Sequence, residues 1–161
     1  MREKAGLLVG MDICEDYVQL TYYDNELLSP ESVSRGEGEE QYLIPARLAY
    51  RKSKNDWIIG DELDKEESGD IVEVQDFIKY ACLYEEIRVY DKTYKAKQLM
   101  KIFLEALLNV LNSFYPFNEI EYLGITFPTV TKEMSYMMSA VLKELGFEKE
   151  KYILLTHDEA F

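Results

Sequence analysis

Three carboxylates near the start of the chain are the residues best placed to do chemistry. Asp12 closes an apolar run, and Glu15 and Asp16 follow within four residues. Carboxylates at the end of a strand can hold the two metal ions with which nucleases cleave phosphodiesters. The formal charge of −13 argues against that chemistry, because it repels phosphate backbones at long range. A nucleic-acid substrate or partner is therefore not expected.

The cysteines and the histidine indicate neither a zinc site nor an enzymatic nucleophile. Cys14 and Cys82 lie far apart in the sequence and form no CxxC spacing, and no recognisable motif connects them with His157. We interpret the cysteines as the reduced thiols of a cytosolic protein. We interpret His157 as a surface residue at the end of a strand.

Two acidic stretches, residues 31–41 and 61–70, are interpreted as solvated surface, the second with a short exposed helix. They contribute to the acidic balance of the whole chain, which has 31 acidic and 18 basic side chains. Such a balance suits a basic or metal-bearing partner better than an anionic one.

The elements that must position Asp12 begin with a hairpin. Residues 7–12 and 17–23 are predicted strands, joined by a turn over residues 13–16. A third short strand is expected to continue through Leu27 and Leu28, until Ser29 and Pro30 stop it. Three antiparallel strands would then lie side by side.

An inserted region is expected at about residues 42–93. Residues 42–50 carry a proline near their start and fit an edge strand or an extended segment, with which residues 57–60 would pair as a hairpin. Apolar residues return at 72–74 and 77–83, where we expect a short, irregular segment.

The second half of the chain alternates helices and strands. Residues 94–114 predict a helix that is buried over most of its circumference. Residues 122–127 and 152–156 predict buried strands, separated by a helix over residues 134–145 with Thr131 as its N-cap. A strand, helix, strand unit of this spacing implies a parallel crossover.

Together these elements predict an α/β fold. Three antiparallel strands followed by two parallel strands, with flanking helices, form a mixed sheet. Ligands are then expected at the carboxyl ends of the parallel strands and at the first hairpin turn.

This order of parts resembles the first lobe of the actin, heat-shock chaperone and sugar-kinase ATPase superfamily, which has a ribonuclease H-like core. The chain is most similar to the chaperone-type members, and the resemblance covers nearly all of residues 1–161 as a single lobe. The segments that carry it are Val9-Gly10-Met11-Asp12, Ile44-Pro45, residues 57–62, residues 125–128, Gly146-Phe147 and residues 157–161.

The resemblance implies ATP and magnesium as cofactors. Asp12 would organise the water shell of the magnesium ion, which keeps much of its hydration. Lys79 would steady the attacking water. The phosphate-binding positions fall on Ile13, Cys14, Glu15 and Asp16. For Asp12 the alternative is a residue that ends a buried strand and accepts turn hydrogen bonds, and for Lys79 it is an ordinary exposed lysine.

The sequence departs from the family at the phosphate loop itself. The family follows its aspartate with a small apolar residue and then a set such as Gly-Thr-Thr, whose amides and hydroxyls hold phosphate. Here those positions read Cys14, Glu15 and Asp16. Each repulsion between unit charges about 4 Å apart costs roughly 1 kcal/mol in water and about 4 kcal/mol at an effective dielectric constant near 20. We therefore expect weak or lost nucleotide binding.

The hypothesis that follows is a lobe with a degenerate phosphate loop, which serves in scaffolding or in binding a protein partner. The alternative is a working magnesium-ATP-dependent ATPase or kinase when a second lobe is joined. In the family that lobe supplies the second phosphate loop and the adenosine pocket, and we expect the chain to lack it, so turnover by the chain alone is not expected. The first apolar stretch, broken by Asp12, is too short for a membrane span, and a cytoplasmic location is expected.

Overall fold

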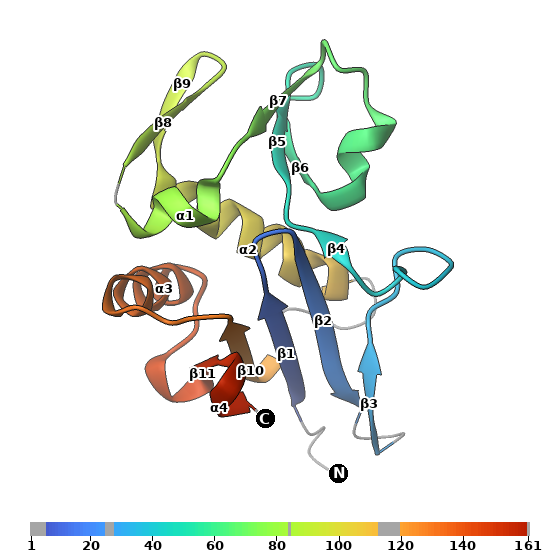
Figure 1. The fold of residues 1–161 in the computed structure, drawn as a ribbon, viewed down its shortest axis with the longest axis vertical. Coiled ribbons are helices and arrows are strands. Elements are labelled where there is room, and N and C mark those ends of the chain that lie inside the picture. Colours follow the sequence, from blue (N-terminus) through green and yellow to red (C-terminus); the bar gives the residue numbers. More distant parts are fainter. Residues whose placement is uncertain (1–5, 25–27, 84, 113–119, 161) are drawn as a thin grey trace.

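The computed structural model of the protein describes residues 6–24, 28–83, 85–112 and 120–160, and it shows a mixed α/β fold (Figure 1). The elements follow one another as β1 (Leu7–Ile13), β2 (Tyr17–Asp24), β3 (Ser29–Ser32), β4 (Ile44–Pro45), β5 (Leu48–Arg51), β6 (Asp56–Ile59), the 3₁₀ helix η1 (Gly60–Lys65), β7 (Ile71–Val74), α1 (Phe77–Cys82), β8 (Glu86–Val89), β9 (Lys92–Lys95), α2 (Ala96–Asn112), β10 (Ile120–Phe127), α3 (Lys132–Glu144), the 3₁₀ helix η3 (Lys149–Lys151), β11 (Tyr152–Thr156) and α4 (His157–Ala160).

The central sheet has the strand order β11-β10-β1-β2-β3, and β4 also pairs with β2. β1, β2 and β3 are antiparallel, whereas β1 pairs in parallel with β10, and β10 with β11. Three antiparallel strands thus continue into a parallel half, as the sequence predicts. The mixed sheet with flanking helices confirms the predicted α/β fold.

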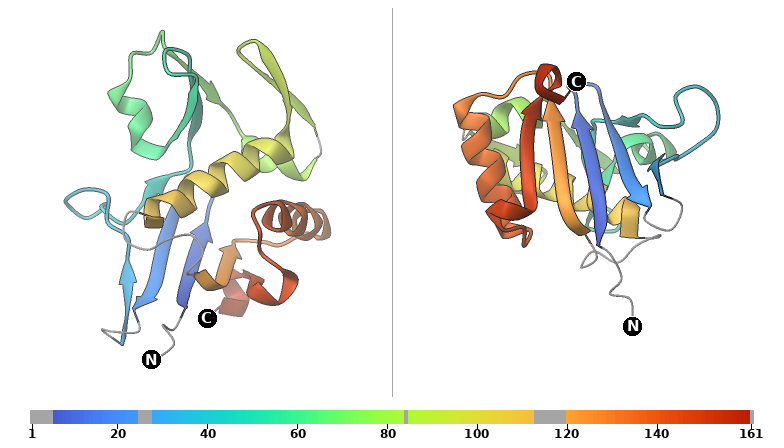
Figure 2. Two further views of the ribbon diagram at one scale, coloured as in Figure 1. Left: turned by 180° about the vertical axis from the view of Figure 1, so that it is seen from behind. Right: turned by 90° about the horizontal axis from the view of Figure 1, so that it is seen from below.

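One face of the central sheet packs on α2, which lies across it (Figure 2). Residues recurring at helical spacing on α2, among them Leu99, Phe103 and Leu107, are fully buried. They pack in one core with Val9, Met11 and other residues from the facing side of the sheet. The described part of the chain holds no helix with the length and apolar character needed to cross a membrane.

Two small sheets lie beside the central one. β5 lies between β6 and β7 in a second, antiparallel sheet, and β8 and β9 form a hairpin. Figure 1 shows both on the far side of α2 from the central strands. The pairing of residues 57–60 with the preceding segment is confirmed, but the division into one lobe with an insertion at about 42–93 stays a prediction.

Several predicted boundaries were wrong. Ser29 and Pro30 do not stop the third strand but begin β3, because a proline is tolerated on an outer strand whose N–H needs no partner; Leu27 lies outside the described residues. The predicted strand at 42–50 is broken into β4 and β5, since the chain makes a tight turn between them in which Arg47 N–H donates to Pro45 O at 2.8 Å.

The segments between the predicted elements hold more regular structure than expected. The predicted irregular segment at 77–83 is helix α1, and the start predicted for the long helix at residue 94 falls in β9. The end predicted at 114 lies outside the described residues. By contrast, the predicted cap of α3 is confirmed, because Thr131 Oγ1 accepts a hydrogen bond from Met134 N–H at 3.1 Å.

Candidate functional site

A pocket of about 760 Å³ lies beside the turn that joins β1 and β2. Its walls come from this turn, from the connection between β7 and α1, from α1 itself, and from the segment between β10 and α3. The lining includes five predicted site residues: Ile13, Cys14, Glu15, Asp16 and Lys79. Asp12 is not part of the lining. The structure thus brings together the predicted phosphate-binding turn and the predicted lysine, whose roles stay predictions.

The charge of this pocket is unfavourable for an anion. Four carboxylates and two cations line it: Glu15, Asp16, Glu73 and Asp76 against Arg47 and Lys79. Glu15 and Asp16 are both exposed. Their carboxylates therefore stand where a phosphate would approach.

Arg47 does not offset these carboxylates, because its guanidinium is already occupied. Its Nε donates to Glu73 Oε1 at 2.8 Å, and its Nη1 donates to Asp64 Oδ1 at 2.7 Å. These hydrogen bonds raise the pKa of Arg47 further above its ordinary value. Lys79 forms no ion pair with any residue in the described ranges, so it is the cation of the pocket that a ligand can reach.

Asp12 lies on the other face of the sheet. Successive side chains of a strand alternate between faces, so Met11 and Ile13 are buried toward α2 while Asp12 points away from it. There its Oδ1 accepts a hydrogen bond from Thr126 Oγ1 at 2.8 Å and lies 2.6 Å from His157 Nε2. The Asp12 carboxylate is therefore already in contact with two side chains of the same protein.

The topology explains why these three residues meet. β1, β10 and β11 are parallel neighbours, so their carboxyl ends lie at one edge of the sheet. Asp12 is paired with Thr126 across the ladder, and His157 begins α4 directly after β11. Neighbouring strands are about 4.8 Å apart. The His157 side chain therefore reaches across β10 to contact a residue two strands away.

Cys14 begins the turn between β1 and β2, and its N–H donates to Tyr17 O at 2.9 Å. Burial raises the pKa of the Cys14 thiol, a hydrogen bond with the Tyr17 side chain opposes this, and the nearby carboxylates of Asp12 and Asp16 add to it. The free thiol is consequently neutral around pH 7.

The contact between His157 and Asp12 is the feature of the candidate site that the sequence did not reveal. The position of His157 at the end of a strand is confirmed, but its interpretation as a surface residue was incomplete, since its side chain is 32% exposed and contacts Asp12. The contact could have been anticipated from the position of His157 at the carboxyl end of a predicted parallel strand, because ligand-binding side chains commonly lie at that edge of a sheet.

Comparison with solved structures gives the class of this fold. The chain is similar to MreB 5 of Spiroplasma citri bound to AMPPNP, with a TM-score of 0.60 and 16% identity over 96% of this chain and 39% of that one. It is also similar to a non-polymerising mutant of MamK bound to AMPPNP, with a TM-score of 0.58 and 13% identity over 96% of this chain and 42% of that one. Both neighbours are actin-like ATPases, and the chain spans about two fifths of their length.

The chain belongs to a family of unknown function, the DUF5716 C-terminal family, which it matches over residues 29–161. β1 and β2, which carry Asp12 and the turn, precede the matched range. No curated protein matches the sequence.

Proposed function

We propose that the chain is an actin-like ATPase-fold lobe whose own nucleotide binding is weak or lost and which serves as a scaffold or binds a protein partner. The observation that carries this proposal is the acidic turn: Glu15 and Asp16 are exposed and line the pocket beside the first hairpin. A phosphate there meets two carboxylates instead of a glycine-rich set of donors.

The state of Asp12 supports the same proposal. A magnesium ion takes hard oxygen ligands and keeps several waters. The oxygen that would orient those waters already lies 2.6 Å from His157 Nε2 and 2.8 Å from Thr126 Oγ1. Binding a hydrated magnesium ion would require these contacts to be exchanged.

Calorimetric titration of the full-length natural protein with magnesium-ATP tests the proposal. We expect no saturable binding in the micromolar range. Micromolar binding accompanied by turnover would overturn the proposal. A double variant, Glu15→Thr with Asp16→Thr, should raise the affinity by roughly tenfold or more, because removing two like charges about 4 Å away relieves about 1 kcal/mol each in water.

The matched control removes two carboxylates elsewhere. Glu37 and Glu39 are exposed in the loop between β3 and β4, and their double threonine variant changes the net charge by the same amount. It should leave the affinity unchanged. An equal gain in both double variants would mean that the net charge, not the turn, limits nucleotide binding.

A working magnesium-ATP-dependent ATPase or kinase, completed by a second lobe, is the second candidate. It is favoured by Lys79, which lies in the same pocket as the turn, and by the AMPPNP bound to the two neighbouring structures. In that case Asp12→Asn should abolish turnover by the full-length protein. Unchanged turnover would remove Asp12 from the catalytic role.

Other features of the sequence support a chaperone-type relation, a protein partner and a cytoplasmic location. The order of segments such as Ile44-Pro45 and Gly146-Phe147 supports a relation to the chaperone-type members of the superfamily. The charge of −13 supports a protein partner rather than nucleic acid or an anionic membrane. Two cysteines with free thiols, Cys14 and Cys82, support a cytoplasmic location.

A further inference from the structure

Asp12, Cys14 and His157 bring three different metal-ligating groups to one point. A carboxylate oxygen of Asp12, the Sγ of Cys14 and a ring nitrogen of His157 all lie within 4.8 Å of one another. Asp12 is the penultimate residue of β1, and Cys14 follows directly after that strand, two positions further on. His157 reaches the same place from the end of β11.

We propose that this triad, Asp12, Cys14 and His157, is a binding site for a zinc-class divalent transition metal. The inference is independent of whether the chain binds nucleotide. The sequence spacing of Cys14 and His157 gives no sign of such a site, because 142 intervening residues separate them and only the parallel strand order unites them.

The mixture of ligand types decides the class of metal. Magnesium and calcium prefer oxygen ligands alone. Thiolate, imidazole and carboxylate together suit zinc, which is bound by all three in proteins.

The spacing of the ligand atoms fits a site that is assembled on binding. Two ligand atoms about 2.0 Å from a tetrahedral zinc ion lie roughly 3.3 Å apart, whereas Asp12 Oδ1 and His157 Nε2 are 2.6 Å apart. A small side-chain rotation, or use of the second carboxylate oxygen, makes the required room. Both side chains are about one third exposed, which leaves an entry path.

Binding forms a metal–sulfur bond as the Cys14 thiol loses its proton to solvent, while His157 binds as the neutral imidazole. Three protein ligands leave the fourth position of a tetrahedral ion for water or for an external ligand. Cys14 also lines the 760 Å³ pocket, so the metal would lie at the edge of that pocket.

Titration of the purified, tag-free protein with cobalt(II), as a spectroscopic substitute for zinc, tests the site. We expect one cobalt ion per chain, with the strong visible bands of tetrahedral cobalt, a thiolate charge-transfer band, and displacement by zinc but not by magnesium. Cys14→Ser should remove the charge-transfer band. Cys14→Ser and His157→Gln should each lower zinc affinity by more than the roughly 10–100-fold that loss of an outer-shell partner costs.

The second cysteine provides the matched control. Cys82 is half-buried and also lines the pocket, but it is outside the triad, so Cys82→Ser should bind cobalt like the wild type. Circular dichroism of the metal-free variants checks that each is folded. The proposal is overturned if the wild type binds no cobalt at micromolar concentration, or if binding survives in both Cys14→Ser and His157→Gln, since the metal would then lie on surface carboxylates.

Discussion

The central sheet and the small sheet formed by β6, β5 and β7 are stabilised in different ways. The central sheet packs on α2 through fully buried apolar side chains, and no polar or charged side chain of the described residues is buried with them. The small sheet contributes Leu48, Ile59 and Val74 to the same core, and it adds a small apolar cluster whose buried members are Ala49, Ile58 and Leu63.

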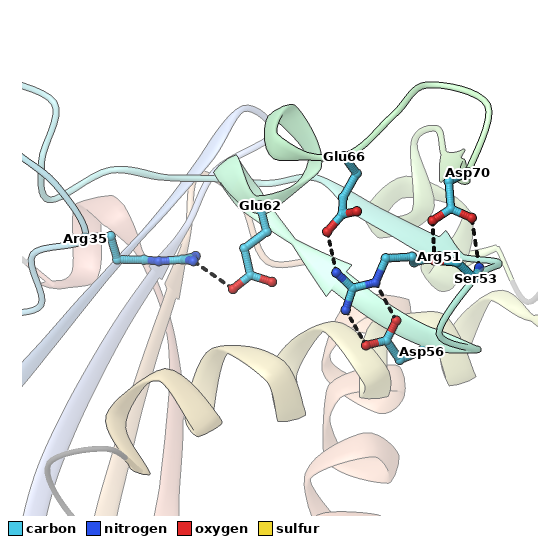
Figure 3. Close-up of polar contacts among 7 residues, drawn as sticks. All are labelled: Arg35, Arg51, Ser53, Asp56, Glu62, Glu66 and Asp70. Carbon is cyan, nitrogen blue, oxygen red and sulfur yellow. Dashed lines mark hydrogen bonds and ion pairs between the residues drawn. The ribbon is translucent and has the colours of Figure 1, made fainter.

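Ion pairs also surround the small sheet, as Figure 3 shows. Arg51 donates to both carboxylate oxygens of Asp56, at 2.9 and 2.6 Å, and also pairs with Glu66. Arg35 reaches from the loop after β3 to Glu62 at 3.1 Å. The acidic stretch at 61–70, interpreted from the sequence as solvated surface, therefore supplies counter-ions for arginines of the neighbouring segments.

The two regions differ in whether their carboxylates are paired with cations. Carboxylates of the small sheet are compensated locally, whereas the turn carboxylates Glu15 and Asp16 have no cation paired with them in the described structure. A basic partner would accordingly be attracted to the turn and the pocket beside it more than to the small sheet.

The largest effect is expected from Phe103→Ala in α2. Phe103 is fully buried and packs edge-on against Phe77 with ring centroids 4.9 Å apart. Truncating a buried phenylalanine costs about 3–5 kcal/mol of unfolding free energy through lost burial and the cavity left behind. Urea unfolding followed by circular dichroism measures the loss. Tyr136→Ala is the control, because that ring is 61% exposed, and it should change stability little.

The same variant tests whether the two sheets unfold together. Trp57 is the single tryptophan of the chain and lies in β6, and its ring packs edge-on against Tyr94 of β9 at 5.3 Å. If the small sheet depends on the core around α2, Trp57 fluorescence and circular dichroism should shift together in Phe103→Ala. Separate transitions would show that the small sheet is an independent unit.

A smaller loss is expected from Gly60→Ala, where the small sheet meets the central one. Gly60 has φ +64°, and a Cβ there would lie 3.1 Å from Ile44 Cγ2 and 3.2 Å from Arg35 Nη1. The left-handed conformation alone costs a residue with a Cβ about 1–2 kcal/mol. Unfolding followed by Trp57 fluorescence measures the effect on the small sheet.

Gly69→Ala is the matched control in the same region. No atom lies within 4 Å of the Cβ built there, and its φ is not in the left-handed range. Its stability should stay within about 0.5 kcal/mol of the wild type. Equal losses in the two variants would show that the junction at Gly60 is not the strained point.

The sequence was sufficient for the central sheet because its signals are local and strong. Apolar runs and a capped amphipathic helix identify β1, β10, α3 and β11, and the strand, helix, strand order of the last three implies a parallel crossover. The β8–β9 hairpin was missed because residues such as Lys92 and Lys95 give it no apolar alternation to recognise. α1 was missed because it is only six residues long and begins after Asp76, whose φ of 52° and lack of a side-chain cap give no start signal.

The site was only partly predictable for a related reason. The turn residues and Lys79 could be named individually, and the pocket unites them. The contact between Asp12 and His157, however, joins positions 145 apart in the sequence through the order of three parallel strands. Local patterns carry no information on such a pair.

The smallest effect is expected from Asp56→Asn, which removes the negative charge that pairs with Arg51 beside the small sheet. The hydrogen bond from Arg51 lowers the pKa of the Asp56 carboxyl, which is 44% exposed. A carboxyl whose pKa is lower in the folded than in the unfolded state stabilises the fold above its unfolded pKa, about 3.9 for aspartate. That contribution is lost as the pH falls through the lower, folded-state pKa.

Asp56→Asn should therefore be less stable than the wild type at pH 7. This loss should be smaller than that in Gly60→Ala, because partly exposed ion pairs contribute little. The difference should begin to shrink as the pH falls below about 4, where the unfolded-state carboxyl becomes protonated, and it should be lost below the lower, folded-state pKa of Asp56. Urea unfolding by Trp57 fluorescence between pH 7 and pH 3 measures it. Glu67→Gln is the control, since Glu67 is exposed in the same acidic stretch and forms no ion pair with the described residues. A difference for Asp56→Asn that stays constant with pH would mean that the side-chain shape at this position, and not its charge, stabilises the small sheet.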